Sequence, residues 1–527
     1  MTDLVDASAV DLFDEWHARG DDPTTTTFRT ALPATPPGPG QQYRFEVDLD
    51  LCTGCKACVS ACHSLNGLDE GETWRSVGLL IGTEPPEPAR PSVSARSVPA
   101  VPAPWQQHVT SACHHCLEPA CLAGCPVEAY EKDPVTGIVA HLDDQCIGCR
   151  YCMLTCPYEV PTFNSRLGIV RKCDMCSDRL AEGEAPACVQ GCPTEAISIG
   201  LVNTAELAAD LVTDPAASLV PTAPRSTLTS PTTVYLSRRT PPADATAADS
   251  HDFVPAHDHP PLVAMLVLTQ LSVAAFVLGR LVGTGSLPRS MSWVTAIVAI
   301  GASILHLGRP LMAWRALLGL RHSWLSREIL AFGVYAPLAG ATALADLRWF
   351  PQAWSAPLAV ATAAVGIVGV GCSAQLYAVT GRPLWRLDRS MARFVLSGIA
   401  TAAPAVALAS AASGDRSDGQ VLAVVTVVAT VAALLGAVAF VLHHRGGSDS
   451  LGRSVTLMTG ALLRRTRWGA SAAAGAALAA LLAASSAGGA SLWWWTLSSV
   501  AAMSAAWLER SLFFTASSPD RMPGGLP

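Results

Sequence analysis

CTGCKACVSAC at residues 52–62 and CIGCRYCMLTC at residues 146–156 share one spacing, C-x2-C-x2-C-x3-C. Two further groups follow the spacings C-x2-C-x4-C-x3-C at residues 113–125 and C-x2-C-x11-C-x3-C at residues 173–192. The four groups hold 16 of the 17 cysteines, and three of them end in Cys-Pro. Four thiolates are the ligand set of a [4Fe–4S] cluster, so the spacing predicts four such clusters. The predicted metal ligands are Cys52, Cys55, Cys58, Cys62, Cys113, Cys116, Cys121, Cys125, Cys146, Cys149, Cys152, Cys156, Cys173, Cys176, Cys188 and Cys192.

Disulfides and zinc are the two other common uses of clustered cysteines. Disulfide frameworks belong to exported chains, whereas residues 1–40 contain no apolar run and no twin arginine. Structural zinc usually takes two C-x2-C pairs, without a third cysteine three residues on and a Cys-Pro shortly after. We therefore favour iron–sulfur clusters, with zinc as the main alternative.

The two halves of the chain differ in charge. Residues 1–260 hold 34 Asp and Glu against 16 Lys and Arg, whereas residues 261–527 hold 8 against 19. An acidic N-terminal half argues against nucleic acid as a partner. In the C-terminal half the positive charges lie between apolar runs, which indicates a lipid bilayer as the environment.

The expected architecture is an α+β ferredoxin-like multi-cluster domain followed by an all-α bundle of eight transmembrane helices. Alternating apolar residues predict strands at residues 43–51, 137–141 and 196–200. Residues 203–260 are rich in Ala, Thr, Pro and Ser, which predicts a mostly irregular linker with a short helix near residues 206–212. The predicted units are an N-terminal extension (1–42), the cluster domain (43–202), the linker (203–260), the membrane anchor (261–510) and a C-terminal tail (511–527). The extension is expected to form either a short helix with one apolar face or a loosely ordered tail. A Pro-rich surface loop is expected at residues 83–104 of the cluster domain.

Most of the apolar runs after residue 260 approach the roughly 20 residues needed to cross a bilayer. They cover residues 262–283, 291–307, 328–345, 356–379, 392–413, 419–442, 468–487 and 491–508. A buried helical domain would explain any one of these runs, but not eight in succession.

The arginines predict which face of the membrane carries the cluster domain. Eight spans put both termini on one face, and fifteen arginines then fall on that face. Four fall on the opposite face, namely Arg280, Arg289, Arg348 and Arg416. Because positive residues stay in the cytoplasm, the sequence predicts a multi-pass protein of the cytoplasmic membrane with its cluster domain inside.

An imidazole and a carboxylate are predicted at the same membrane edge. His306 lies at the end of the second run, and Glu328 lies at the start of the third. A quinol that gives electrons to a cluster must also lose protons, for which His and Glu are suitable bases. The alternative is an interfacial histidine and a glutamate favoured by a helix dipole. Haem is not expected, because the histidines after residue 260 all fall at run ends or in loops.

The four cysteine groups resemble the four-cluster electron-transfer subunit of dimethyl sulfoxide reductase-type molybdoenzymes. The stretch Arg171-Lys172-Cys173-Asp174-Met175-Cys176 is similar to the fourth group of that subunit. The C-terminal half resembles the eight-span anchor of the same complexes, on the basis of His306-Leu307-Gly308-Arg309-Pro310 and of Glu328. This resemblance implies a quinol site that involves His306, Glu328 and Arg309. In the known complexes the two subunits are usually separate, whereas here they are fused.

The resemblance also implies that cluster ligands are exchanged between groups. The implied sets are Cys52, Cys55, Cys58 with Cys192; Cys173, Cys176, Cys188 with Cys62; Cys113, Cys116, Cys121 with Cys156; and Cys146, Cys149, Cys152 with Cys125.

The function expected from these features is non-catalytic electron transfer and membrane anchoring. (Mena)quinol from the membrane quinone pool would be oxidised, and four clusters would carry the electrons to a separate molybdopterin catalytic subunit, dimethyl sulfoxide reductase-like or nitrate reductase-like. The alternative is electron flow in the reverse direction, from a dehydrogenase partner, such as a formate dehydrogenase, to quinone. A transporter or redox sensor is less favoured, because the spans contain few mid-membrane polar residues and no output domain is visible.

Overall fold

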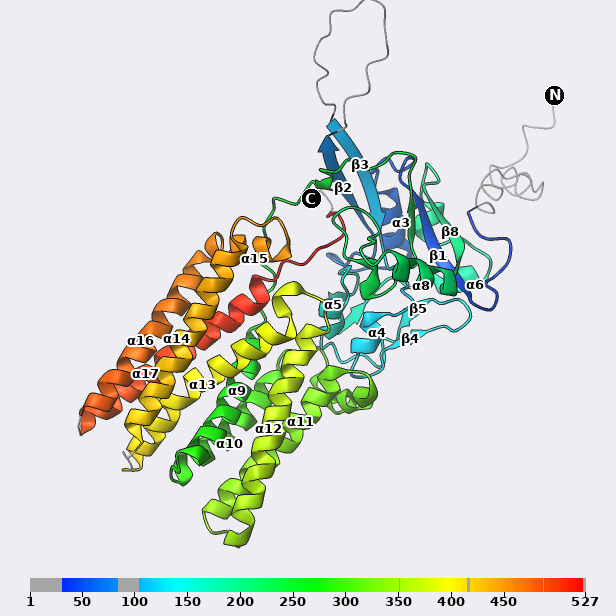
Figure 1. Cartoon of the computed structure of the whole chain (residues 1–527). Helices are drawn as coiled ribbons and strands as arrows, with labels where there is room; N and C mark the ends of the chain where they lie inside the picture. Colours follow the sequence, from blue (N-terminus) through cyan, green and yellow to red (C-terminus); the bar gives the residue numbers. More distant parts are fainter. Residues whose placement is uncertain (1–30, 84–103, 350, 415–417, 487, 525–527) are drawn as a thin grey trace, which may run out of the picture.

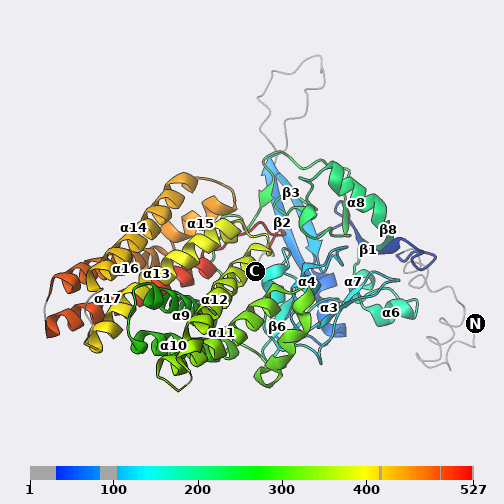
Figure 2. The same ribbon diagram turned by 60° about the horizontal axis from the view of Figure 1, so that its bottom comes forward.

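The computed structural model describes residues 31–83, 104–349, 351–414, 418–486 and 488–524. The chain forms an α+β domain that is followed by a bundle of long helices, as predicted (Figure 1). The α+β domain lies against one end of the bundle in both ribbon views, with α11 and α12 among the nearest helices (Figure 2). The predicted N-terminal helix and most of the Pro-rich loop lie outside the described residues.

Four small sheets form the framework of the cluster domain. The first has the order β8-β1-β9, in which β1 is antiparallel to β8 and parallel to β9. Phe45 and Val47 of β1 are buried, which gives this strand the alternation that its sequence predicts. The strands are β1 (Gln41–Asp48), β2 (Ser76–Thr83), β3 (Pro104–Ser111), β4 (Tyr130–Lys132), β5 (Val139–His141), β6 (Thr162–Asn164), β7 (Ile169–Arg171), β8 (Ile197–Asn203), β9 (Val234–Leu236) and β10 (Thr246–Ala247).

Short helices and tight turns present the cysteines. The helices are α3 (Ala57–Leu65), α4 (Ala120–Gly124), α5 (Tyr151–Thr155), α6 (Ser177–Ala181) and α7 (Ala187–Gln190). Three cysteine groups end in the same turn, Cys-Pro-x-Glu, whose glutamate is left-handed: φ is 56° at Glu128 and 55° at Glu159 and Glu195. This turn aims the next backbone N–H at the cysteine sulfur, as at Ala129, which donates to the Sγ of Cys125 at 3.3 Å.

The segment 203–260 differs from the irregular linker that we predicted. It begins with α8 (Thr204–Thr213), close to the predicted short helix. It then adds a strand to each three-stranded sheet: β9 pairs with β1, and β10 pairs with β2. The segment therefore belongs to the cluster domain. Strands of three and two residues are too short to give a periodic sequence signal.

Eight long helices follow residue 260 in the described part of the chain. They are α9 (Pro260–Leu281), α10 (Ser286–Ile304), α11 (Trp324–Asp346), α12 (Ser355–Ala378), α13 (Leu387–Ala412), α14 (Gly419–His444), α16 (Leu463–Ser485) and α17 (Gly489–Thr515). Seven of these helices, α9 to α14 and α16, are long and apolar enough to cross a membrane. The eighth, α17, has 27 residues and packs against α16, α13 and α9, although its Trp and Ser residues make it less apolar.

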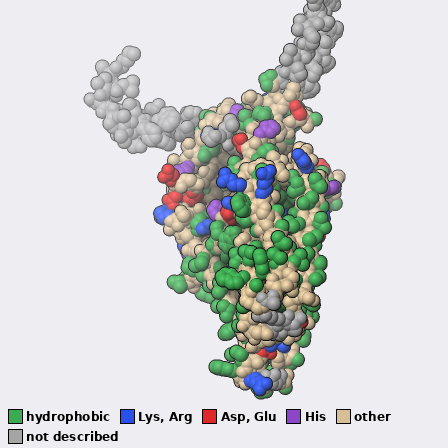
Figure 3. All heavy atoms as spheres, turned by 90° about the vertical axis from the view of Figure 1, so that its left-hand side faces the viewer, with side chains coloured by type: hydrophobic (Ala, Val, Ile, Leu, Met, Phe, Trp, Pro, Cys, Tyr) green, Lys and Arg blue, Asp and Glu red, His purple; other side chains and the backbone are tan. Residues whose placement is uncertain are grey.

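The surface of the bundle fits a bilayer. A broad band of hydrophobic side chains covers the face in Figure 3, and Lys and Arg side chains gather near the border of this band with the cluster domain. Two of the segments between the long helices are themselves helical, η2 (Pro310–Arg321) and α15 (Ser450–Thr459). Of these, η2 separates α10 from α11, and the residues on either side of it, among them Gly308, Arg309 and Ser323, contact the cluster domain.

Candidate functional site

The structure brings the cysteines together across their sequence groups. Cys192 lines one cavity with Cys52, Cys55 and Cys58, which we call the distal site. Cys156 lines a second cavity with Cys113, Cys116 and Cys121, which we call the third site. These are two of the sets implied by the resemblance.

The other two sets also assemble as implied. The thiol of Cys62 lies close enough to those of Cys176 and Cys188 to interact with them electrostatically, and Cys173 interacts with Cys62 and Cys188. We call this set the second site. In the same way Cys125 interacts with the thiols of the group that starts at Cys146; the members of this membrane site are Cys125, Cys146, Cys149 and Cys152.

The chemistry of these sets fits iron–sulfur ligation. Burial, followed by the charge of Cys188, raises the pKa of Cys62 to about 12. Thiolates packed together in this way persist only when a metal centre neutralises them. Backbone N–H groups also point at the sulfurs: Met175 donates to Cys173 at 3.4 Å, and Gly148 donates to Cys146 at 3.4 Å. Such hydrogen bonds are typical of cluster ligands. None of the seventeen cysteines, all within the described ranges, forms a disulfide.

The four sites follow one another as pairwise neighbours. Cys58 of the distal site interacts with Cys188 of the second site, and Cys173 of the second site interacts with Cys113 of the third. Cys121 of the third site packs in another core with Cys146 of the membrane site. The order is therefore distal, second, third and membrane site. Of the sixteen cysteines, Cys55 at the distal end alone is exposed.

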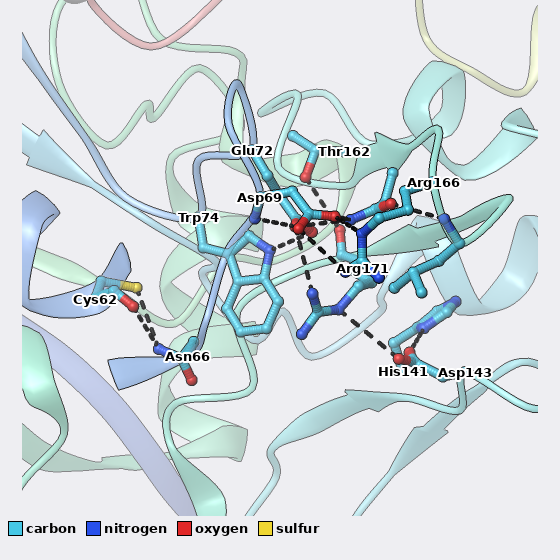
Figure 4. Close-up of polar contacts among 12 residues, drawn as sticks. Cys62, Asn66, Asp69, Glu72, Trp74, His141, Asp143, Thr162, Arg166 and Arg171 are labelled. Carbon is cyan, nitrogen blue, oxygen red and sulfur yellow. Dashed lines mark hydrogen bonds and ion pairs between the residues drawn. The ribbon is translucent and has the colours of Figure 1, made fainter. Parts of the chain in front are cut away.

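Ionic contacts hold the loop after α3 against the β6–β7 hairpin. The Asp69 carboxylate accepts two hydrogen bonds from Arg166, at 2.9 and 3.1 Å, and one from Asn164 at 2.7 Å (Figure 4). Glu72, whose side chain is 3% exposed, accepts from Arg171 at 3.3 Å. This network joins the loop that follows the first cysteine group to the hairpin that contacts the membrane domain.

The loop after α10 docks on the membrane site. Gly308 lies so close to the turn of the β6–β7 hairpin that a Cβ there would be 1.9 Å from the carbonyl oxygen of Gly168. The backbone N–H of Arg309 donates to the carbonyl of Ile147 at 3.0 Å, and that of Gly308 donates to the carbonyl of Gly148 at 3.4 Å. The motif at residues 306–310 is therefore the contact between the membrane loop and the cysteine loop 146–149.

A second set of contacts joins the start of α11 and the end of α12 to two cysteine groups, those at residues 113–125 and 146–156. Ser323 Oγ donates to the carbonyl of Gly124 at 2.7 Å. The hydroxyl of Tyr151, two residues after Cys149, donates to the carbonyl of Leu376 in α12 at 2.6 Å. Because Gly124 precedes Cys125 and Tyr151 precedes Cys152, these bonds hold the membrane site against the ends of α11 and α12.

A cavity of about 320 Å³ lies at this junction. His306 and Glu328 both line it, and so does Cys149 of the membrane site. Glu328 is 2% exposed, and its carboxylate accepts a hydrogen bond from Ser373. His306 Nδ1 is buried and has no hydrogen-bond partner in the described part of the chain. The rest of the lining is largely apolar and aromatic: Ile147, Tyr151, Leu154, Leu262, Met265, Thr269, Ile300, Ser303, Ile304, Leu307, Ala313, Trp314, Ala316, Leu325, Ile329, Phe332, Gly333, Leu376 and Tyr377.

Arg309 has a different position from the one we predicted. We expected it to bind quinol together with His306 and Glu328, but it does not line the cavity. Its guanidinium donates instead to the backbone carbonyls of Asp143 and Cys146, at 2.7 and 3.4 Å. Arg309 therefore attaches the membrane loop to the cluster domain.

Comparison with known proteins agrees with both halves of this architecture. A family described as "4Fe-4S dicluster domain" matches residues 105–202, and one described as "DMSO reductase anchor subunit (DmsC)" matches residues 256–514. The B subunit of the anaerobic dimethyl sulfoxide reductase of Escherichia coli K12 is 36% identical over 167 residues, which are 31% of this chain and 75% of that protein. The chain belongs to the dimethyl sulfoxide reductase family.

Another member of this family and a hydrogenase-related protein are also similar. The B subunit of the Haemophilus influenzae dimethyl sulfoxide reductase is 32% identical over 168 residues, covering 31% of this chain and 76% of that protein. The hydrogenase-2 operon protein HybA of Escherichia coli O157:H7 is 36% identical over 181 residues, covering 31% of this chain and 53% of HybA. The resemblance inferred from the cysteine groups and the His306 motif is confirmed, and so is the fusion of an iron–sulfur subunit with an anchor subunit.

Sequence reasoning missed several residues of the junction. Tyr151 and Cys149 line the membrane cavity although they belong to the cluster domain. Ser373 donates to Glu328 from another helix, 45 residues away. No local sequence pattern reveals such contacts between distant residues. Once the cluster nearest the membrane is known, the position of Tyr151 in the same cysteine group as Cys149 does indicate that it lies near the membrane cavity.

Proposed function

We propose that this chain is the electron-transfer and anchoring subunit of a membrane-bound molybdopterin oxidoreductase, and that it oxidises (mena)quinol in the cavity between its two domains. One observation carries the proposal: His306, Glu328 and Cys149 line the same cavity. A quinol bound there would touch two candidate proton acceptors and the edge of a cluster site at once.

The chemistry at this cavity separates protons from electrons. His306 can take a proton at its unpaired Nδ1, and the carboxylate of Glu328 can take the other. Ser373 holds the Glu328 side chain in place by donating to it. The apolar lining suits a quinol ring and excludes water.

Four clusters in the order membrane, third, second and distal site would form the path for electrons. When bound, each cluster accepts and passes on one electron at a time. The chain's own residues set the spacing of this path, because neighbouring sites share buried cores. The exposed Cys55 makes the distal site the exit, where a separate molybdopterin catalytic subunit would dock.

We place the cluster domain on the cytoplasmic side. The excess of arginines on its side of the bundle supports this placement. Two of the four arginines on the opposite side are also compensated, because Asp346 pairs with Arg280 at 3.7 Å and with Arg289 more closely. A reporter fused after Pro527 should be active only in its cytoplasmic form.

Variants of the two proton acceptors test the proposal. His306→Leu and Glu328→Gln should each slow quinol-dependent cluster reduction by about 10²–10⁴-fold, the usual contribution of an acid–base group. Reduction of the same clusters by a strong chemical reductant should be unaffected, and their EPR signals should remain. Unchanged quinol-dependent rates in both variants would remove the proposed quinol site.

The reverse direction is a second candidate, which the match to a protein of the hydrogenase-2 operon favours. In that case a dehydrogenase partner would reduce the distal site, and quinone would be reduced in the cavity. Purifying the complex and measuring which substrate of its catalytic subunit reduces or oxidises the clusters decides between the two directions.

A further inference from the structure

Two buried cations lie between the cysteine sites, and neither has a role in ligation. Arg75, next to the start of β2, is 2% exposed. Its NH1 donates to Thr110 Oγ1 at 3.1 Å, and its guanidinium lies over the ring of Phe45 at 4.7 Å. Its Nε and NH2 groups have no hydrogen-bond partner among the described residues, and the charged groups that act on it there are cysteines rather than carboxylates. A desolvated guanidinium in this state requires a nearby negative charge.

The negative charge available to Arg75 is that of two cluster sites. Thr110, which holds Arg75, also lines the cavity of the distal site, and its Oγ1 is 3.5 Å from Cys58 Sγ. Phe45, which Arg75 covers, packs in the same buried core as Cys62 and other cysteines of the second site. Arg75 is therefore placed between the distal and second sites.

Lys172 has the equivalent position one step closer to the membrane. It is 3% exposed, and its Nζ donates to the backbone carbonyls of Val139 and Cys173, the latter at 2.9 Å. It lines the cavity of the third site, and its chain neighbour Cys173 belongs to the second site. No ion pair joins Lys172 to a carboxylate in the part of the chain that is described.

We propose that Arg75 and Lys172 are fixed cations that raise the reduction potentials of the clusters on either side of them. The inference rests on the proposed set of four clusters. Reduction adds a negative charge to a cluster, and net charge and hydrogen bonds to the sulfurs set its potential. Each buried cation stabilises the reduced form of both neighbours, so it keeps the middle of the path accessible to electrons that enter at the membrane site.

The size of the effect follows from Coulomb's law. A unit charge about 7–10 Å from a cluster, at an effective dielectric constant of about 20, changes the ratio of reduced to oxidised cluster by roughly 15- to 50-fold. Each tenfold change corresponds to about 59 mV for a one-electron couple. Water cannot screen either cation, because both are almost fully buried.

The test is an EPR-monitored redox titration of the complete purified complex. Arg75→Met should lower the reduced fraction of two clusters, those of the distal and second sites, at least tenfold at a fixed potential. Lys172→Met should do the same for the second and third sites. The double variant should then shift three of the four clusters and leave the membrane-site cluster unchanged. Arg75→Lys and Lys172→Arg keep the charge, so they should titrate close to the wild type.

Two controls separate charge from structure. Arg44→Met removes a cation that is part-exposed and paired with Glu46 at the surface, and it should shift no cluster. Iron analysis of each variant, with about 16 Fe expected per chain for four clusters, reports on the clusters independently of their potentials. A count of about 8 Fe or fewer in the wild type would refute the set of four clusters itself.

Two results would overturn the role of the cations. One is unshifted potentials in Met variants that retain their iron, and the other is an equal shift in the charge-conserving variants. If Arg75→Met loses its iron, Arg75→Gln takes its place, because it removes the charge but keeps a hydrogen-bond donor for Thr110. Lowered potentials of the distal and second clusters in Arg75→Gln support the proposal, and wild-type potentials contradict it.

Discussion

Replacing Gly308 by alanine should weaken the contact between the membrane loop and the membrane site. A Cβ at this position would lie 1.9 Å from the carbonyl oxygen of Gly168, so the two backbones must separate by about 1.5 Å to reach ordinary contact at 3.4 Å. Overpacking of this kind costs about 1–3 kcal/mol, which lowers the equilibrium constant for docking by about 5- to 150-fold. Because His306 belongs to the same loop, quinol-dependent cluster reduction should slow measurably, by a factor of up to about 150.

Stopped-flow measurement of cluster reduction by quinol, in the purified protein in lipid nanodiscs, checks this prediction. Gly301→Ala is the matched control, because Gly301 lies in α10 and a Cβ there would meet nothing within 4 Å. Cluster reduction in Gly308→Ala as fast as in Gly301→Ala would refute the role of this contact in docking. Loss of the clusters from Gly308→Ala would also contradict it, because the contact would then be needed for assembly and not only for docking.

Three further predictions concern the junction, the cluster domain and energy coupling. Tyr151→Phe removes the hydrogen bond to the backbone carbonyl of Leu376, so the full chain should lose about 1 kcal/mol of stability. Calorimetry should show a lower Tm, and an unchanged Tm would show that this bond contributes nothing. Glu72→Ala leaves the hydrogen-bond partners of the buried carboxylate unsatisfied, which should lower the free energy of unfolding by about 1–3 kcal/mol in chemical denaturation. Arg166→Ala removes an ion pair at the exposed edge of the same network and should lower it by less than about 1 kcal/mol. Turnover in sealed vesicles should generate no substantial membrane potential, because quinol protons are released on the side where the reductase consumes them; a large uncoupler-sensitive potential contradicts this arrangement.

The cysteine spacing predicted the character of the N-terminal half, and the apolar runs predicted that of the C-terminal half, because both signals are local. Four thiolates at close spacing, as at residues 146–156, are typical ligands of an iron–sulfur cluster and are found in few other kinds of site. Runs of about 20 apolar residues have few stable environments. The candidate bases His306 and Glu328 could also be predicted to meet, since an even number of spans brings both to one membrane edge. The structure agrees to the extent that both line one cavity.

The junction between the domains could not be predicted, because it depends on contacts between distant residues. The glycines at positions 148, 168 and 308 meet at one point, yet nothing in the local sequence of each one indicates this. The resemblance assigned Arg309 to the quinol site because it belongs to the motif at residues 306–310. The direction of its guanidinium, however, is set by backbone carbonyl groups of the other domain. The strands β9 and β10 were missed for the same reason, since only their partner strands define them.

The entry point of the electrons gives the most direct test of this account. Cys149→Ser alters the membrane site, and Cys55→Ser alters the distal site by the same chemical change at the opposite end of the path. Freeze-quench EPR after mixing with quinol should show that Cys55→Ser still reduces its membrane, third and second clusters. Cys149→Ser should reduce none of its remaining clusters with quinol, although a strong chemical reductant still reduces them. Quinol-dependent reduction of those clusters at the wild-type rate in Cys149→Ser would contradict the central claim that electrons enter through the membrane site.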